Sequence, residues 1–438
     1  MARIIVDCTH TFQTGAGTGI QRVVRRFADS LLAIAGEAGF EVVPVRLEGA
    51  GLVALPVAEG RVAFPNAGIR GSVAPDPSRR RFEIAHLWVS RAGRLLGSSR
   101  LREWADASPN EAGLARWLAG RDGAGTGSAT IAPRPGDIFV SLDSSWVYDI
   151  RTALDALGRA GATRVAFIHD VLPVTHPQWF TPGTDRCFRG WIEALLPRTD
   201  GFVTNSRTSC AEFRAVAESL GHAPPPCRAV HLGAELAVAG EGAVRPALAG
   251  ALAPGRPPAF LTVGTIEPRK NVGFAIDLFD ELDSRGLDFQ WHVVGSPGWL
   301  ADEVARRIRG HRAYGKRLHW WVGLGDAELD WCYRHAAALV AVSTAEGFGL
   351  PLVEARLREL PVFASDIPVF REVLGAEGSY LPLSSARLAA AALEDFLAGL
   401  GGQCRRPSPS RIARPWVDSA RELVAALVEI DARRRGPG

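Results

Sequence analysis

Lysine and methionine are nearly absent from this sequence of 438 residues. Only Lys270 and Lys316 are lysines among the 50 Lys and Arg residues, and methionine occurs once. Such a bias toward arginine is typical of a GC-rich genome, in which arginine codons displace lysine codons. A lysine that persists against the bias is therefore a candidate for a position whose chemistry requires an ammonium group.

An excess of charge of one sign is also missing. The formal net charge is +3, which is too small to indicate nucleic-acid binding by charge alone. Hydrophobic residues make up 47% and charged residues 22% of the chain, which excludes a disordered protein. A chain of this length is expected to form two or three domains.

The six cysteines include no C-x-x-C pair. Their wide spacing argues against a disulfide framework and a zinc site, and it favours free, mostly buried thiols in a reducing compartment. No apolar run approaches the ~18–20 residues of a membrane-spanning helix, and residues 1–10 lack the pattern of a signal peptide. We therefore expect a cytoplasmic protein that is either soluble or peripheral on the cytoplasmic face of a membrane.

Short apolar segments alternate along the chain with longer amphipathic segments, which predicts a parallel α/β fold. In residues 272–285 the apolar side chains recur at helical spacing, and Gly286 stands where a glycine is expected after a helix. The predicted strands are residues 3–7, 41–45, 137–142, 164–168, 201–204, 228–232, 259–263, 290–294, 317–322, 338–343 and 361–364. The predicted helices are residues 19–34, 185–198, 208–220, 272–285, 300–310, 326–337, 351–359 and 415–431.

Two segments interrupt the alternation. Residues 236–258 are rich in Ala, Gly and Pro, and we interpret them as a linker. Residues 50–135 are interpreted as an insertion with one or two helices around 100–119. Because ligands of open α/β sheets bind at the carboxyl ends of strands, we expect the site in the cleft between two such sheets. The predicted parts are an N-terminal domain (1–240), a C-terminal domain (256–405) and a closing segment (406–438).

The string AEGFGLPLVE, residues 345–354, directly follows a predicted strand. Pro351 suits the first turn of a helix, and the glycines before it let backbone amides approach a ligand closely. Amides at a helix N-terminus are suited to phosphate. Glu354, about one turn into the helix, can accept hydrogen bonds from a sugar diol, and Glu346 precedes the turn. The alternative is a capped helix with two surface glutamates, which the length of the string disfavours.

A second strand-to-helix turn has the sequence GTIEPRKN, residues 264–271. The adjacent Arg269 and Lys270 offer a planar fork and a point charge, two complementary ways to hold a diphosphate. One of the two lysines of the chain thus lies in this turn. The alternative is a solvated basic turn without a ligand.

Glycines also follow the first predicted strand, in the string GAGTGIQR of residues 15–22. The spacing G-x-G-x-G differs from the G-x-G-x-x-G of dinucleotide-binding proteins, and no strand-end acid follows about 20 residues later. Nicotinamide binding is therefore disfavoured.

The two strand-to-helix motifs resemble those of the retaining glycosyltransferases of family 4, in their mannosyltransferase-like branch. EGFGLPLVE matches the E-x7-E element of that family, and GTIEPRKN matches its phosphate-binding turn. The segment FIHDVLP of residues 167–173 resembles an H-D-x-x-P element, while Thr204-Asn205-Ser206 and GAGTGIQR resemble two further turns of the family. The implied fold is GT-B, an α/β architecture of two Rossmann-like domains facing across a cleft, with a C-terminal helix crossing back to the first domain. The resemblance covers nearly the whole chain except residues 50–135.

The resemblance implies how a nucleotide-diphosphate donor is held. Arg269 and Lys270 would neutralise the diphosphate, and Thr265 stands where many relatives carry an arginine, a role that Arg269 is expected to cover. The remaining residues implied at the phosphates are Gly347, Phe348, Gly349 and Leu350 of the turn before the helix, and Gly17 and Gly19 of the glycine loop.

On the sugar side, the resemblance implies three further contacts. Glu354 would bind the ribose hydroxyls, Glu346 would contact hydroxyls of the transferred sugar, and His169 would lie near the reacting centre. No metal site is expected, because no D-x-D element follows a strand and two cations are present instead.

The implied activity is a retaining, metal-independent transfer of a mannose- or rhamnose-like sugar from a GDP-, UDP- or dTDP-sugar, with no further cofactor. The implied acceptor is a glycan or lipid-linked oligosaccharide of a bacterial surface polysaccharide such as an O-antigen, and no nucleic acid is expected as a partner. Two alternatives stay open. One is a non-catalytic GT-B scaffold of a polysaccharide assembly complex, and the other is a sugar-phosphate synthase or epimerase of the same architecture.

Three weaker features remain. His176 is a secondary candidate for the site. The arginine-rich segment 305–317 is interpreted as a solvated helix face, with an anionic lipid or acceptor as the alternative. The twelve tryptophans are assigned mainly to the core or to the walls of the cleft.

Overall fold

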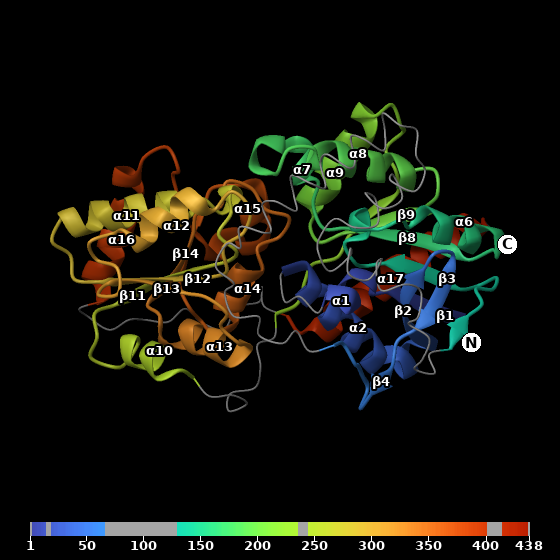
Figure 1. Cartoon of the computed structure of the whole chain (residues 1–438), viewed down its shortest axis with the longest axis horizontal. Coiled ribbons are helices and arrows are strands. Elements are labelled where there is room, and N and C mark those ends of the chain that lie inside the picture. Colours follow the sequence, from blue (N-terminus) through green and yellow to red (C-terminus); the bar gives the residue numbers. More distant parts are fainter. Residues whose placement is uncertain (1, 15–18, 66–128, 235–243, 401–413, 437–438) are drawn as a thin grey trace, which may run out of the picture. The chain divides into compact units, whose positions relative to one another are not determined.

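The computed structural model describes residues 2–14, 19–65, 129–234, 244–400 and 414–436 (Figure 1). Within these residues the chain forms two large sheets, one from the N-terminal and one from the C-terminal half, and a small hairpin of β4 (Val57–Ala58) and β5 (Arg61–Val62).

The first sheet has eight strands in the order β10-β9-β8-β7-β1-β2-β3-β6. The pairs from β10 to β2 are parallel, whereas β3 runs antiparallel to β2. In chain order its strands are β1 (Ala2–Asp7), β2 (Phe40–Glu48), β3 (Gly51–Ala54), β6 (Thr130–Ile131), β7 (Ile138–Ser141), β8 (Thr163–Ile168), β9 (Gly201–Thr204) and β10 (Cys227–Ala229). The helices of this half are α1 (Thr9–Thr14), α2 (Gly19–Ala38), α6 (Arg151–Arg159), α7 (Leu172–Thr175), α8 (Thr184–Leu195) and α9 (Arg207–Ser219).

The second sheet has six parallel strands in the order β13-β12-β11-β14-β15-β16. In chain order they are β11 (Ala259–Val263), β12 (Gln290–Val294), β13 (Leu318–Trp321), β14 (Ala338–Ala341), β15 (Val362–Ser365) and β16 (Ser379–Leu381). The helices are α10 (Pro246–Ala251), α11 (Val272–Ser284), α12 (Asp302–Arg309), α13 (Asp326–His335), α14 (Leu350–Leu357), α15 (Pro368–Leu374) and α16 (Ala386–Leu400).

Successive side chains of a strand point to opposite faces of its sheet. Because consecutive residues of these strands are apolar, both faces of each sheet are apolar. In β1, Ile4 and Val6 join the core formed with α2, whereas Ile5 joins the core formed with α6, α8 and α9. In β11, Phe260 packs with α11, α12 and α16, and Leu261 faces the other core. Helices therefore cover each sheet on two sides, as Figure 1 shows for α11 and α13 on opposite faces of the second sheet.

The last helix, α17 (Trp416–Arg435), follows the second sheet in sequence but packs against α2, β8 and β9 of the first half. The Trp416 ring meets Phe27 edge-on with centroids 5.4 Å apart. A Cβ atom on Gly233 would lie 2.6 Å from the Trp416 Cα, so only glycine allows this approach. The predicted helix that crosses back to the first half is thus confirmed.

Most predicted elements are present, with shifts of a few residues at their ends. Residues 230–232 are not part of a strand, since β10 ends at Ala229. Within the expected insertion, residues 51–54 extend the first sheet as β3. The linker prediction missed α10, a short helix within 236–258. Elements that the sequence prediction missed in full include α6, α15, α16 and β16.

Some sequence predictions fall outside the described residues, namely the helices around 100–119, Cys404 and the first part of the linker. Four of the described cysteines are buried and Cys187 is exposed. Among the described helices, none combines the length and the apolar character needed to cross a membrane.

The packing of α17 yields a first prediction. Trp416 is 3% exposed, so Trp416→Ala should lower the free energy of unfolding by about 3–5 kcal/mol through lost burial and a cavity. Urea denaturation measures this loss. Val428→Ala on the same helix is the control, since Val428 is 40% exposed and its truncation should cost no more than about 0.5 kcal/mol. Equal losses in the two variants would contradict the role of Trp416.

Candidate functional site

The turn after β11 brings Arg269 and Lys270 to the carboxyl end of the second sheet. A short 3-10 helix, Pro268–Lys270, precedes α11, and Asn271 between them adopts φ +51°. Gly264 has φ +145°, and a Cβ there would lie 3.2 Å from the Lys270 Cε. The methylene chain of Lys270 thus lies directly against the glycine backbone.

The second motif follows β14 and leads into α14. Gly349 has φ +100°, and a Cβ on it would lie 2.8 Å from the Phe370 ring. At Gly347 a Cβ would lie 2.4 Å from the His169 carbonyl oxygen. Glycine is therefore required at both positions, because a Cβ atom would collide with these neighbours. Pro351 lies in the first turn of α14, as the sequence predicted.

Hydrogen bonds join the two motifs. The Thr344 amide donates to the Arg269 carbonyl oxygen at 2.8 Å, and the Thr344 hydroxyl lies 3.1 Å from the same oxygen. A narrow cavity between the motifs is lined by Gly264, Lys270, Ser343 and Glu346, among others. The structure therefore brings together the two strand-to-helix turns that the sequence indicated.

Glu346 is the charged centre of this site. Its carboxylate accepts hydrogen bonds from Arg269 Nη1 and Lys270 Nζ, and from the Ser343 hydroxyl at 2.8 Å. Burial by itself would raise the pKa of Glu346, but the charges of Arg269 and Lys270 outweigh burial and hold this pKa at about 2. The carboxylate is therefore ionised at neutral pH.

Arg269 is held from two sides. Its Nη2 atom lies 2.6 Å from Glu267 Oε1, in addition to the contact with Glu346. Burial would lower the pKa of Arg269, but the charges of Glu346 and Glu267 raise it above the usual value. The side chains of Arg269 and Lys270 are only 18% and 14% exposed, so their charges are poorly hydrated.

Glu354 is also buried, and both of its oxygens have partners. Arg22 Nη1 of α2 lies 2.9 Å from Oε1, and the Tyr333 hydroxyl donates to Oε2 at 2.8 Å. Burial raises the pKa of Glu354 despite the opposing charge of Arg22. The roles of Arg22 and Tyr333 were missed from the sequence, although Arg22 closes the GAGTGIQR string.

His169 follows β8 and lies beside the second motif through the contact of its carbonyl oxygen with Gly347. Its Nε2 atom donates to the Leu142 carbonyl oxygen at 2.8 Å, and its ring lies 4.9 Å from that of Phe167. Burial lowers the pKa of His169 to about 4. Its imidazole is therefore neutral and held in one orientation at neutral pH.

The remaining predicted residues lie in different surroundings. Thr265 packs against Gly298. Phe348 is buried near the His231 ring. Gly19 begins α2, with open space around its Cα. Leu350 is the first residue of α14. Gly17 is outside the described residues.

Two weaker candidates have structural partners. The His176 ring stacks on Trp179 with centroids 4.3 Å apart. The segment 305–317 is helical only up to Arg309, the end of α12, so the predicted helix face was wrong beyond that residue. Arg307, Arg312 and Arg317 pair with aspartates of α11. Among the described residues, no three His, Cys, Asp or Glu side chains form a group that could hold a metal ion.

Comparison with known proteins agrees with this fold. Residues 248–400 match the family Glycosyl transferases group 1. The chain is 34% identical over 301 residues to the serotype-specific mannosyltransferase WbdA of Escherichia coli. That alignment covers 66% of this chain but only 37% of WbdA, so the chain spans little more than a third of this relative.

Solved structures match along the whole chain. Sucrose-phosphate synthase from Thermosynechococcus elongatus has a TM-score of 0.58 at 17% identity, covering 99% of this chain and 98% of that one. HepE of Anabaena, solved with UDP and glucose, has a TM-score of 0.55 at 12% identity with the same coverage. The chain is thus a GT-B protein. Within this fold, residues 248–400 are the part that matches the group 1 glycosyltransferases.

The surroundings of His169 yield a second prediction. Because its pKa is lowered to about 4, the nitrogen-15 chemical shifts of its ring should stay at neutral-imidazole values between about pH 5 and pH 8. The spectrum of His169→Asn assigns the signal by its loss. Titration of this signal near pH 6.5, the value of an unperturbed histidine, would contradict the buried, neutral state.

Proposed function

We propose that this protein is a retaining glycosyltransferase that moves a mannose- or rhamnose-like sugar from a nucleotide-diphosphate donor to a glycan or lipid-linked acceptor. The observation that carries the proposal is the convergence of Arg269 and Lys270 on one carboxylate just before the N-terminus of α14. Two poorly hydrated cations beside a helix N-terminus form an environment suited to a diphosphate.

The donor diphosphate would take over the interaction that Glu346 makes with the two cations. A diphosphate carries more negative charge than one carboxylate, and the guanidinium of Arg269 can bind it in a bidentate manner. Glu346, released from part of this interaction, would then accept hydrogen bonds from hydroxyls of the transferred sugar. The amides of Phe348, Gly349 and Leu350 would supply further donors.

The nucleoside part of the donor would reach Glu354. Its oxygens are engaged by Arg22 and Tyr333, so ribose hydroxyls would share the carboxylate with these side chains or replace Arg22. The nucleotide base is proposed to be guanine, uracil or thymine. Support for a nucleotide donor comes from HepE, a protein of the same fold solved with UDP.

The transfer step needs a stabilised leaving group above all. The bond between the anomeric carbon and the diphosphate oxygen breaks, and its electron pair leaves with the diphosphate. A hydroxyl oxygen of the acceptor forms the new bond on the same face of the sugar, and its proton passes to the departing phosphate oxygen. Arg269 and Lys270 would stabilise the charge that develops there, and we propose that no metal ion is needed.

His169 would contribute as a neutral, fixed imidazole beside the transferred sugar. Since Nε2 donates to Leu142, Nδ1 is the ring nitrogen left to accept a hydrogen bond from a sugar hydroxyl. This assignment agrees with the lowered pKa of His169, because an imidazolium could not accept such a bond.

The biological setting is proposed from the relatives and the motifs. WbdA is a serotype-specific mannosyltransferase, and the H-D-x-x-P element at residues 169–173 points to the same branch. We therefore propose a role in a bacterial surface polysaccharide such as an O-antigen, with the enzyme in the cytoplasm or on the inner face of the membrane. The intact set of Lys270, Glu346 and His169 favours an enzyme over a non-catalytic scaffold.

The two lysines of the chain allow a matched test of the proposed site. Lys270→Ala should reduce kcat/KM for sugar transfer by about 10²–10³-fold, because one preorganised charge at the leaving diphosphate is lost. Lys316→Ala removes the exposed second lysine and should leave transfer within about twofold of wild type. Radiolabel transfer from a panel of GDP-, UDP- and dTDP-sugars measures both, and equal rates for the two variants would reject the site.

Glu354→Gln provides a further prediction. The variant keeps the size of the side chain but loses the negative charge that pairs with Arg22 and is proposed to accept the ribose hydroxyls. Because a neutral amide accepts hydrogen bonds more weakly than a carboxylate, KM for the donor should rise by about tenfold or more. Donor titrations under initial-rate conditions test this expectation. An unchanged KM would show that Glu354 does not contact the donor.

A further inference from the structure

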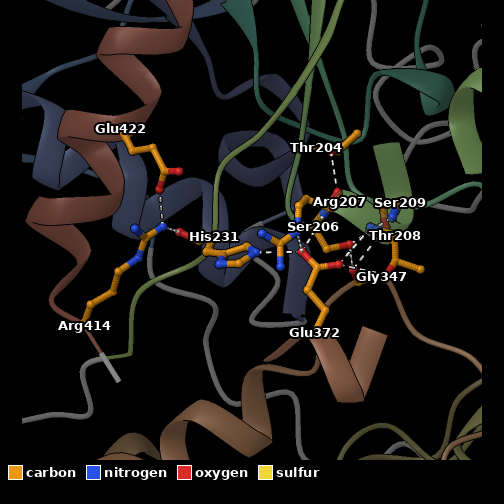
Figure 2. A network of polar contacts seen from close by, with 10 residues as sticks. All are labelled: Thr204, Ser206, Arg207, Thr208, Ser209, His231, Gly347, Glu372, Arg414 and Glu422. Carbon is orange, nitrogen blue, oxygen red and sulfur yellow. Dashed lines mark hydrogen bonds and ion pairs between the residues drawn. The ribbon is translucent and has the colours of Figure 1, made fainter. Parts of the chain in front are cut away.

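The N-terminus of α9, in the first half of the chain, holds the glycine turn of the second half (Figure 2). The hydroxyls of Ser206 and Ser209 both donate to the carbonyl oxygen of Gly347, at 2.8 and 3.1 Å. Both serines are fully buried. A buried carbonyl with two hydroxyl donors is fixed in direction.

Ser206 has two functions at this point. Its side-chain oxygen accepts the Ser209 amide at 3.0 Å and so caps α9, while its hydroxyl hydrogen is directed to Gly347. Thr204 donates to the Ser206 carbonyl oxygen at 2.8 Å. The Thr204-Asn205-Ser206 turn therefore presents the Ser206 hydroxyl to the second half of the chain.

Glu372 of α15 holds the same helix end from the second half. Its carboxylate accepts the Arg207 amide at 2.7 Å, and the Thr208 amide and hydroxyl at 2.9 and 2.8 Å. His231 Nε2 lies 2.7 Å from the same carboxylate. Burial would raise the pKa of Glu372, but these hydrogen bonds lower it to about 2, so the carboxylate remains charged at the helix N-terminus.

The fixed carbonyl determines where the next amide points. In a planar trans peptide, the carbonyl of Gly347 and the N–H of Phe348 point in opposite directions. Two hydroxyls on the carbonyl therefore direct the Phe348 N–H away from α9. The absence of a Cβ at Gly347 lets this peptide lie against the His169 carbonyl oxygen as well.

We propose that Ser206 and Ser209 are positioning residues that orient the turn at residues 347–350 for the donor diphosphate, with Glu372 holding α9 in place. The proposal rests on the proposed function for its ligand. The orientation of the turn itself is a property of the free protein, and this makes the two claims separable by experiment.

Ser209→Ala is the cleanest variant, because it removes one hydroxyl from Gly347 and leaves the Ser206 cap intact. Ser209→Thr restores a hydroxyl and serves as the rescue. Ser219→Ala is the matched control, since Ser219 lies at the other end of α9 and donates within its own helix, to Val216. Thermal unfolding checks that all three variants remain folded.

Two measurements test the proposal. Hydrogen exchange of the free protein, followed by mass spectrometry, should show about fivefold or faster exchange at residues 345–350 in Ser209→Ala, but not in Ser209→Thr or Ser219→Ala. Calorimetry with GDP, UDP and dTDP should show about tenfold weaker binding to Ser209→Ala of whichever nucleotide the wild-type protein binds.

The possible results separate the two claims. Exchange and affinity in Ser209→Ala equal to those of Ser219→Ala would overturn the positioning role. If the wild-type protein binds none of the three nucleotides, the proposed function fails, and the exchange rates then decide the orientation of the turn alone. Faster exchange with unchanged nucleotide affinity would also reject the proposal, because the turn would then not be oriented for the diphosphate.

Discussion

The site depends on one buried ionic interaction, in which the Glu346 carboxylate lies between Arg269 and Lys270. Two cations this close together and this far from water repel each other strongly, so they need a negative charge between them. Glu346 supplies that charge in the free protein. A diphosphate can supply more of it, so the interaction that stabilises the free site would, in the proposed function, also prepare it for the donor.

Close backbone approach explains the residue types around this ion pair. Lys270 extends along Gly264, and a flexible ammonium chain suits that narrow space better than a planar guanidinium. Gly347 lies against the His169 carbonyl oxygen, and its own carbonyl accepts two serine hydroxyls from α9. The turn that would hold the phosphates is thus supported by the half of the chain that carries His169, and this would link donor binding to the proposed reacting centre.

Much of the fold and part of the site could be predicted from the sequence, because both are local. Apolar strands followed by Gly-rich turns and helices define β11, β14 and the two motifs within a few residues each. Contacts between distant residues could not be predicted. Arg22 reaches Glu354 across 332 positions of sequence, and Glu372 meets the N-terminus of α9 only after folding. The alanine-rich α16 was also missed.

The most direct test of the site is a crystal structure of the protein with a bound nucleoside diphosphate. We expect diphosphate oxygens at about 2.7–3.2 Å from Lys270 Nζ and from the Arg269 guanidinium, with Glu346 turned away from at least one of the two cations. A nucleotide bound elsewhere, with Glu346 still bridging both cations, would contradict the account.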